Sequence, residues 1–281
     1  MIRQKSYNDS PSLYLIPTPV GNMEDITLRA VNTLKMVDFI LCEDTRITSE
    51  LLSKLEIKKK LVHSDDHTED GLKEMVLSKL QEGLNIGLVT DRGTPIISDP
   101  GYKIVEYVSK NGYNVISLPG PTAFVPAITA SGLNPQPFLF YGFLNSKKSK
   151  REKELESLKK LPYTIILYEA PHRIHEMLES LLEVFGDRRI ALNREISKRY
   201  EEIIRGNISE VLEVVDTLKG EMVVVVEGNV ESEDYSSMTV LEHINLYLED
   251  GMSEKDAIKK VAVERGVPKS VIYKEYHIDN K

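Results

Sequence analysis

Three short segments of the chain concentrate glycine, proline and acidic residues directly after apolar runs. They span residues 17–22, 91–101 and 119–123. Glycine lets a backbone approach a ligand closely, proline keeps a loop rigid, and a carboxylate accepts hydrogen bonds from hydroxyl or amino groups. Turns favour the same residues, so a single segment of this kind is ambiguous. Three of them, each ending an apolar run, predict a preformed ligand cleft.

Other common catalytic and binding motifs are missing from the sequence. It has no Gly-x-Gly-x-x-Gly fingerprint, no Walker-type phosphate loop and no metal-ligand spacing. Ser98 lacks the Gly-x-Ser-x-Gly setting of a serine hydrolase. A single cysteine, Cys42, excludes an internal disulfide and a cysteine-based zinc site. We therefore predict an enzyme without a metal ion, in a reducing compartment.

Apolar runs of strand length alternate with amphipathic segments of helix length in the N-terminal part of the chain. The expected strands are 13–16, 39–42, 86–90 and 114–118, and the expected helices are 26–36, 49–55, 72–80 and 102–110. This alternation predicts a parallel α/β sheet covered on both faces. The three ligand segments then lie at carboxyl ends of strands, where open parallel sheets bind ligands.

The sequence Pro119-Gly120-Pro121 breaks the pattern, and we expect a hinge there. The expected strands beyond it are 138–143, 163–168, 189–193, 201–205 and 222–227, with helices at 150–160 and 173–185. These elements predict a second α/β domain with a more mixed sheet. The polar stretch 231–234 is an expected linker, and helices at 253–264, capped by Ser253, and 270–276 predict a helix-turn-helix. The expected organisation is a tail at 1–12, α/β domains at 13–120 and 121–229, and a linker with a helical appendage at 230–281.

The composition is typical of a soluble globular protein, with 41% hydrophobic and 28% charged residues. No apolar run approaches the roughly 20 residues of a membrane span, and no secretory signal begins the chain. We expect a cytoplasmic protein. The net charge of −8 argues against a nucleic-acid partner. Basic clusters at 147–153 and 188–205 nevertheless leave RNA binding open, although such clusters are often only solvated surface.

Several motifs in order carry a family resemblance. They include the segment 13–22, Glu43-Asp44-Thr45-Arg46, Ser98-Asp99-Pro100-Gly101, the segment 168–173 and Lys219-Gly220-Glu221-Met222. Together they resemble the ribosomal RNA small subunit methyltransferase I branch of the tetrapyrrole methylase superfamily. The resemblance covers about residues 13–229 and extends to the terminal helix pair.

The resemblance implies a homodimer of two-domain subunits with S-adenosylmethionine in the cleft between the domains. It implies methyl transfer to the ribose 2′-oxygen of a cytidine in the decoding region of 16S rRNA, with the rRNA or the small ribosomal subunit as partner. The residues it assigns to the cofactor are Pro17, Gly21, Asp91, Gly93, Thr94, Ser98, Asp99, Pro121, Thr122, Tyr168 and Glu221.

A ribose hydroxyl becomes a good nucleophile when a base removes its proton. Candidate bases are Asp44, Glu169 and Glu195, each beside an Arg or a His, and His67, whose side chain titrates near neutral pH. A structural ion pair with the neighbouring residue is the alternative for each carboxylate. The residues expected to hold RNA phosphates are Arg46, Lys147, Lys148, Arg173 and Arg194.

The chain departs from the family pattern at three positions. Arg92 stands where family members usually carry a small residue, and Asp65 and Thr68 replace a histidine and an asparagine. Two other functions are compatible with parts of the sequence. One is a methylase of the same fold acting on a tetrapyrrole or other small acceptor, and the other is a non-enzymatic regulator that binds nucleic acid through its helix-turn-helix. The regulator leaves the three ligand segments unexplained.

Overall fold

The computed structural model describes residues 3–6, 8–65, 68–229 and 238–279. The chain divides into two compact units, Met1–Gly228 and Asn229–Lys281. The first unit holds two five-stranded sheets, and the second is helical. The predicted linker 231–234 lies outside the described residues.

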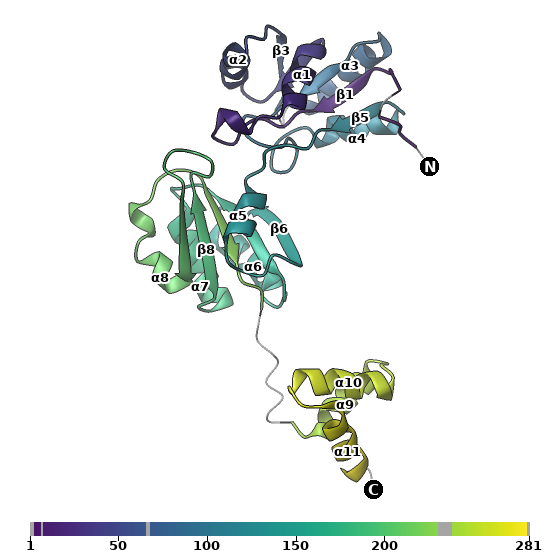
Figure 1. Cartoon of the computed structure of the whole chain (residues 1–281), viewed down its shortest axis with the longest axis vertical. Helices are drawn as coiled ribbons and strands as arrows, with labels where there is room; N and C mark the ends of the chain where they lie inside the picture. Colours follow the sequence, from purple (N-terminus) through teal and green to yellow (C-terminus); the bar gives the residue numbers. More distant parts are fainter. Residues whose placement is uncertain (1–2, 7, 66–67, 230–237, 280–281) are drawn as a thin grey trace. The chain divides into compact units, whose positions relative to one another are not determined.

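The first sheet is parallel throughout, as the alternating pattern predicted, with strand order β3-β2-β4-β1-β5. Its strands are β1 (Ser12–Leu15), β2 (Phe39–Cys42), β3 (Lys60–His63), β4 (Ile86–Leu88) and β5 (Asn114–Ser117). Its helices are α1 (Leu28–Met36), α2 (Thr45–Lys54), α3 (Glu69–Gln81) and α4 (Tyr102–Lys110). Helices α1 and α2 pack on one face and α3 and α4 on the other, so apolar side chains cover both faces (Figure 1).

Side-chain caps fix where the helices of this half begin. The Thr27 hydroxyl accepts a hydrogen bond from Ala30 N at 3.0 Å, so α1 starts at Leu28. The Asp44 carboxylate accepts one from Arg46 N at 2.8 Å, so α2 starts four residues earlier than predicted. Because each cap ties down an otherwise unpaired backbone donor, the loop before it is held in place.

The second sheet is mixed, as predicted, with strand order β6-β7-β10-β8-β9. Strands β6 (Phe138–Phe143) and β7 (Thr164–Glu169) are parallel, and β8 (Arg189–Arg194), β9 (Glu202–Asn207) and β10 (Met222–Val226) pair antiparallel. All five residues of β10 are buried, which fits an apolar run at the centre of a sheet covered on both faces. Helices α6 (Lys148–Leu158), α7 (Ile174–Phe185) and α8 (Ile208–Leu212) pack on one face, and α5 (Phe124–Ala130) packs on the other.

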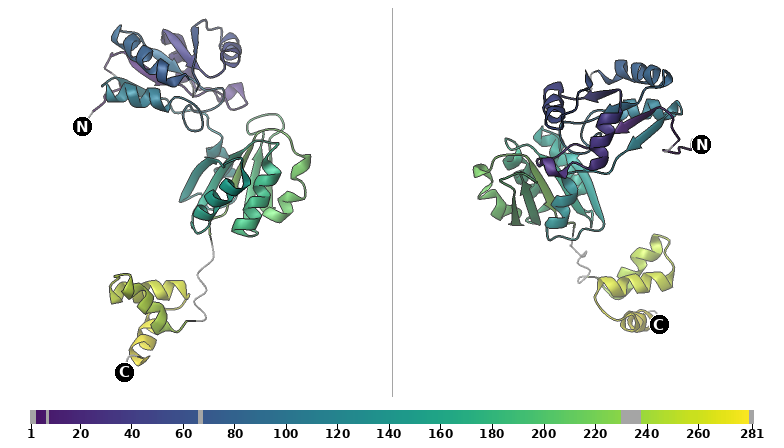
Figure 2. Two further views of the ribbon diagram at one scale, coloured as in Figure 1. Left: turned by 180° about the vertical axis from the view of Figure 1, so that it is seen from behind. Right: turned by 45° about the horizontal axis from the view of Figure 1, so that its top comes forward.

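The helical unit has a core of its own. It contains α9 (Val240–Glu249), α10 (Glu254–Glu264) and α11 (Lys269–Asp279), so a third helix precedes the predicted pair. Ser253 caps α10 as expected, with its hydroxyl 3.3 Å from Asp256 N. Figure 2 shows these three helices in yellow from two further directions. Within the described ranges, no helix is both long and apolar enough to cross a membrane.

Candidate active site

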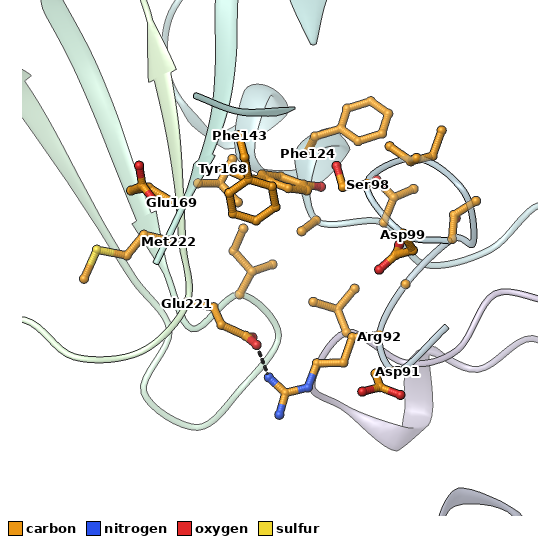
Figure 3. A pocket seen from close by; sticks show the side chains of 18 of the residues that line it. Asp91, Arg92, Ser98, Asp99, Phe124, Phe143, Tyr168, Glu169, Glu221 and Met222 are labelled. Atoms are coloured by element: carbon orange, nitrogen blue, oxygen red, sulfur yellow. Dashed lines mark hydrogen bonds and ion pairs between the residues drawn. The ribbon is translucent and has the colours of Figure 1, made fainter. Parts of the chain in front are cut away.

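A pocket of about 510 Å³ lies within the first unit, where strand ends of the first sheet face the second sheet. Its first wall comes from the loop after β4 and from α2, and its second wall comes from β6, β7 and β10. The segment after β5 also lines the pocket, beginning with Thr122. The site therefore stands at the carboxyl ends of the parallel strands, where the sequence placed it (Figure 3).

The structure brings together eight of the eleven residues predicted to bind the cofactor. They are Asp91, Gly93, Thr94, Ser98, Asp99, Thr122, Tyr168 and Glu221. The other three do not line the pocket. Pro17 packs against Gly120, where an added Cβ would meet Pro17 Cβ at 2.6 Å, and the Pro121 carbonyl accepts a hydrogen bond from Thr94. Gly21 packs against Ile196 and Lys198, and this contact allows no side chain larger than hydrogen.

The loops after the strands are bound to one another. Thr18 and Gly93 exchange two backbone hydrogen bonds of 2.9 and 3.0 Å, which join the loops after β1 and β4. The Thr94 hydroxyl donates to the Pro121 carbonyl at 2.9 Å and so joins the loop after β5. Because the three loops hold each other, the first wall of the pocket is preformed.

The loop after β4 contains a strained residue and a clamp. Ile96 has a φ of 79°, a conformation that a β-branched residue rarely adopts and that the surrounding structure must enforce. At the end of the loop the backbone N–H of Gly101 donates to the buried carboxylate of Glu69, the first residue of α3. Gly101 itself has a φ of 129°, which favours glycine. The clamp fixes the loop against a helix of the first sheet.

Two carboxyls in the pocket wall have raised pKa values. Burial raises the pKa of Asp99, although the Thr90 hydroxyl counteracts part of this shift. Burial also raises the pKa of Asp91, which accepts a hydrogen bond from Asp44 N at 3.1 Å. A partly desolvated carboxylate attracts a cation more strongly than one in water. The pair is therefore suited to a ligand that carries positive charge or hydroxyl groups.

Aromatic rings form the second wall. The Phe143 and Tyr168 rings meet edge to face with centroids 5.6 Å apart, and Tyr168 meets Phe140 in the same way at 5.0 Å. Phe140 in turn lies 4.8 Å from Phe124, a residue of α5. Burial raises the pKa of Tyr168 to about 12, so its hydroxyl stays protonated. The wall offers flat apolar surface beside the two carboxyls.

A charged network crosses the mouth of the pocket. Arg92 from the first wall donates to Glu221 from the second, as the dashed line in Figure 3 shows. Lys198 binds both Glu221 and Glu195, each at 2.9 Å. Burial acts to raise the pKa of Glu195 and of Glu221, but their partners together outweigh it and both pKa values are lowered. The partners are Lys198 and the backbone N–H of Glu221 at Glu195, and Lys198 and Arg92 at Glu221. Arg92 thus extends across the pocket and pairs with the opposite wall.

The candidate bases occupy different surroundings. Asp44 pairs with Arg46 at 2.6 Å, and the hydrogen bonds from Arg46 lower the pKa of Asp44 to about 2. Such a weak base is poorly matched to removing a proton from a hydroxyl. Glu195 pairs with Lys198 rather than with its neighbour Arg194. His67 lies outside the described residues.

Glu169 lines the pocket, but its carboxylate does not join the aromatic wall. Neighbouring residues of a strand point to opposite sides, so Tyr168 packs on the side of α5 and Glu169 on the side of α6 and α7. There its buried carboxylate accepts a hydrogen bond from Ala170 N at 2.9 Å and lies 3.3 Å from Arg173. Burial raises the pKa of Glu169, and Ala170 and Arg173 counteract this shift. Glu169 thus forms a structural ion pair, but with Arg173 and not with His172, the neighbour named for it from the sequence.

The predicted RNA-binding residues divide into two groups. Arg173 donates to the Leu144 carbonyl at 2.9 Å, and Arg194 donates to Glu202 at 2.6 Å and to the Lys219 carbonyl at 2.9 Å. These two side chains are mainly inside the fold. The other three face solvent. Arg46 pairs with Asp44, and Lys148 pairs with Glu152 and Glu183. Lys147 has no ion-pair partner among the described residues.

The two departures at 65 and 68 bind each other in the turn that precedes α3. Thr68 N donates to the Asp65 carboxylate at 2.8 Å, and Asp65 N donates to the Thr68 hydroxyl at 2.9 Å. The Asp65 carboxylate also lies 3.1 Å from His63 Nε2. These bonds shape the entry into α3, the helix whose Glu69 clamps the pocket loop.

Sequence reasoning missed part of the lining. Phe124, Phe143 and Ile47 line the pocket, but no local pattern marks an aromatic or branched residue as part of a site. Ile47 could have been inferred from the placement of α2, since it follows Arg46 in the first turn of that helix. Lys198 was treated only as one member of a basic stretch.

Comparison with known proteins fits this geometry. The sequence profile of the tetrapyrrole (corrin/porphyrin) methylases matches residues 12–212. The chain belongs to the tetrapyrrole methylase family. Its membership makes it a methyltransferase, and the pocket is the candidate active site of that methylase.

Individual proteins are similar to the chain in sequence or in fold. The methylase is 48% identical to ribosomal RNA small subunit methyltransferase I of Bacillus subtilis, over 98% of both chains. It is 43% identical to the protein of the same name from Halalkalibacterium halodurans, over 99% of both. Among solved structures, uroporphyrin-III-C-methyltransferase from Thermus thermophilus shares the fold, with a TM-score of 0.56 and 20% identity over 77% of this methylase and 94% of that chain.

Proposed function

We propose that this methylase transfers a methyl group from S-adenosylmethionine to the ribose 2′-oxygen of a cytidine in the decoding region of 16S rRNA. The observation that carries the proposal is the pocket itself, in which two carboxyls and an aromatic wall from different sheets meet in a chain 48% identical to a named ribosomal RNA methyltransferase. We also propose that the enzyme is a cytoplasmic homodimer, as the family resemblance implies.

The pocket suits S-adenosylmethionine in size and chemistry. Its volume of about 510 Å³ is in the usual range for sites that hold a cofactor-sized molecule. Asp91 and Asp99 would bind the amino and hydroxyl groups and stabilise the positive charge. Thr122 supports this assignment, because its buried hydroxyl has no hydrogen-bond partner within the described part of the chain. A polar ligand would satisfy it.

The protein must orient the hydroxyl that receives the methyl group. S-adenosylmethionine supplies an activated methyl carbon when bound. The interlocked loops and the aromatic wall hold their own positions, so they can fix reacting groups with little loss of entropy. Closure of the mouth by Arg92 and Glu221 would limit the access of water.

Labelled S-adenosylmethionine tests the proposal directly. The enzyme is incubated with naked 16S rRNA, with 30S particles and with a tetrapyrrole, and the labelled product is digested and analysed by mass spectrometry. We expect label in 2′-O-methylcytidine from one of the two RNA substrates. Asp99→Asn should bind the cofactor more weakly and transfer less methyl, whereas Asp70→Asn, on the exposed surface of α3, should leave both unchanged. Label in the tetrapyrrole alone would contradict the proposal.

A further inference from the structure

Phe143 is exposed although it lies in the wall of the pocket. Its side chain, at the end of β6, is 52% exposed, which is unusual for a large aromatic residue. The ring packs edge to face against Tyr168 (Figure 3). Tyr168 packs in turn against Phe140, so the position of the Phe143 ring is restrained. A rigid ring that is half open to solvent is available to a flat molecule.

Two further apolar side chains line the same pocket and are also exposed. Ile47 on α2 is 40% exposed, and Ile97 in the loop after β4 is 49% exposed. That loop approaches β6 closely, since a Cβ added to Gly142 would lie 3.5 Å from Ser98 Oγ. Exposed apolar groups that gather at one pocket usually mark a binding surface.

Two exposed basic residues lie close in the sequence to side chains of this apolar surface. Arg46 directly precedes Ile47, and its side chain is 89% exposed. Lys147 follows Phe143 by four residues and is exposed. A nucleotide combines a flat base with a charged phosphate, so it complements an exposed ring on a surface that also carries basic residues. Unpaired RNA bases commonly stack on aromatic side chains in this way.

We propose that Phe143 is the platform on which the unpaired base of the methyl-acceptor nucleotide stacks, with the flanking phosphates at Arg46 and Lys147. This inference rests on the proposed function and extends it. The cofactor is expected at the carboxyls and at Thr122, which leaves the exposed ring to the acceptor. Phe143 is therefore a positioning residue: it orients the ribose by fixing its base.

The test compares variants of two phenylalanines on one strand. Phe143→Leu removes the ring from the pocket, and Phe138→Leu removes a similarly exposed ring of β6 that does not line it. We expect Phe143→Leu to lower kcat/KM for RNA about 5- to 150-fold, the effect of losing one stacked base. Phe143→Tyr should restore transfer, and Phe138→Leu should resemble the wild type. The Kd for S-adenosylmethionine, measured by calorimetry, should not change in any of them.

A substrate that lacks the base gives a second readout. Wild type and Phe143→Leu are assayed on RNA with an abasic acceptor ribose, naked or in reconstituted 30S particles, whichever the wild type methylates. If the ring stacks the base, the two changes are not additive, and the abasic substrate abolishes the difference between the two enzymes. Independent effects would overturn the inference.

Other outcomes also decide the question. A matching loss of S-adenosylmethionine affinity in Phe143→Leu would assign the ring to the cofactor, and a changed oligomeric state in light scattering would assign it to a subunit interface. Either result overturns the inference and leaves the proposed function intact. No transfer to RNA by the wild type overturns the proposed function and this inference with it.

Discussion

Asp99 combines partial burial with a position in the wall of the pocket. Its pKa is raised by burial, so in the free protein it binds a proton more readily than an exposed aspartate with a pKa of 3.8. The raised pKa means that the contribution of Asp99 to stability is present below the unfolded-state pKa and is lost as the pH rises through the folded-state pKa. Cofactor binding has the opposite dependence, because the cation requires the ionised carboxylate.

We predict that cofactor affinity falls on acidification through the raised pKa of Asp99. A proton and a positively charged ligand compete for the same carboxylate. Calorimetric titrations with S-adenosylmethionine from about pH 8 to about pH 5 measure this dependence. Asp99→Asn should bind about 10- to 100-fold more weakly at neutral pH, the effect of one lost charge-assisted hydrogen bond, and should lose most of the pH dependence. If the affinity of Asp99→Asn kept the pH dependence of the wild type, another titrating group would be responsible for that dependence.

At the scale of elements, the site depends on how α3 holds the loop after β4. We predict that Glu69→Ala lowers the free energy of unfolding by about 1–3 kcal/mol, because the N–H of Gly101 loses its buried partner. The freed loop carries Asp91 and Asp99, so cofactor affinity should fall too.

Two matched variants control that prediction. Glu69→Gln keeps an acceptor oxygen for Gly101 and should lose less stability than Glu69→Ala. Glu74→Ala changes an exposed glutamate of the same helix and should be neutral. Denaturant unfolding and calorimetry provide both readouts. Equal stability of Glu69→Ala and Glu74→Ala would show that the clamp is unimportant.

Elements with a fully buried or clearly amphipathic pattern were predicted from the sequence, whereas an exposed edge strand and a short helix were missed. Strand β2, fully buried, and the amphipathic helix α4 were predicted with the observed bounds. Strand β3 was missed because it is an edge strand with exposed residues at both ends, Lys60 and His63. Helix α5 was missed because it has only seven residues and contains a proline.

The same reasoning explains which parts of the site were predictable. Loops after parallel strands carry recognisable turn residues, so segments 91–101 and 119–123 could be identified from the sequence. Asp91, Asp99 and Thr122 within them were assigned by the family resemblance. The aromatic wall depends on which side of the second sheet a residue faces. That side is set by register: Tyr168 packs with the aromatic residues, whereas the carboxylate of the next residue, Glu169, is buried beside Arg173.

At the scale of the molecule, the helical unit and the α/β unit have separate cores. The core of α9, α10 and α11 contains only residues from Val240 to Tyr276, and the cores of the two sheets contain residues up to Val226. We predict that a chain ending at Gly228 stays folded and binds S-adenosylmethionine with the affinity of the full chain.

Circular dichroism and calorimetry of the truncated and full chains test this independence. The full chain should unfold in two transitions, and the one from the helical unit should be missing after truncation. If truncation left cofactor binding intact but reduced transfer to RNA, the helical unit would contribute to binding the RNA acceptor. Loss of cofactor binding on truncation would contradict the separation of the two units.

The two walls of the pocket are anchored in different hydrophobic cores, and this has a consequence for evolution. Side chains of the aromatic wall pack on the core of the second sheet, whereas the carboxyl-bearing loop is fixed to the first. A substitution that changes only the apolar packing of one wall therefore leaves the hydrophobic core beneath the other unchanged. A lineage can exchange its acceptor by altering the second wall while it inherits the donor site, which is a route by which one fold comes to serve methylases with differently named acceptors.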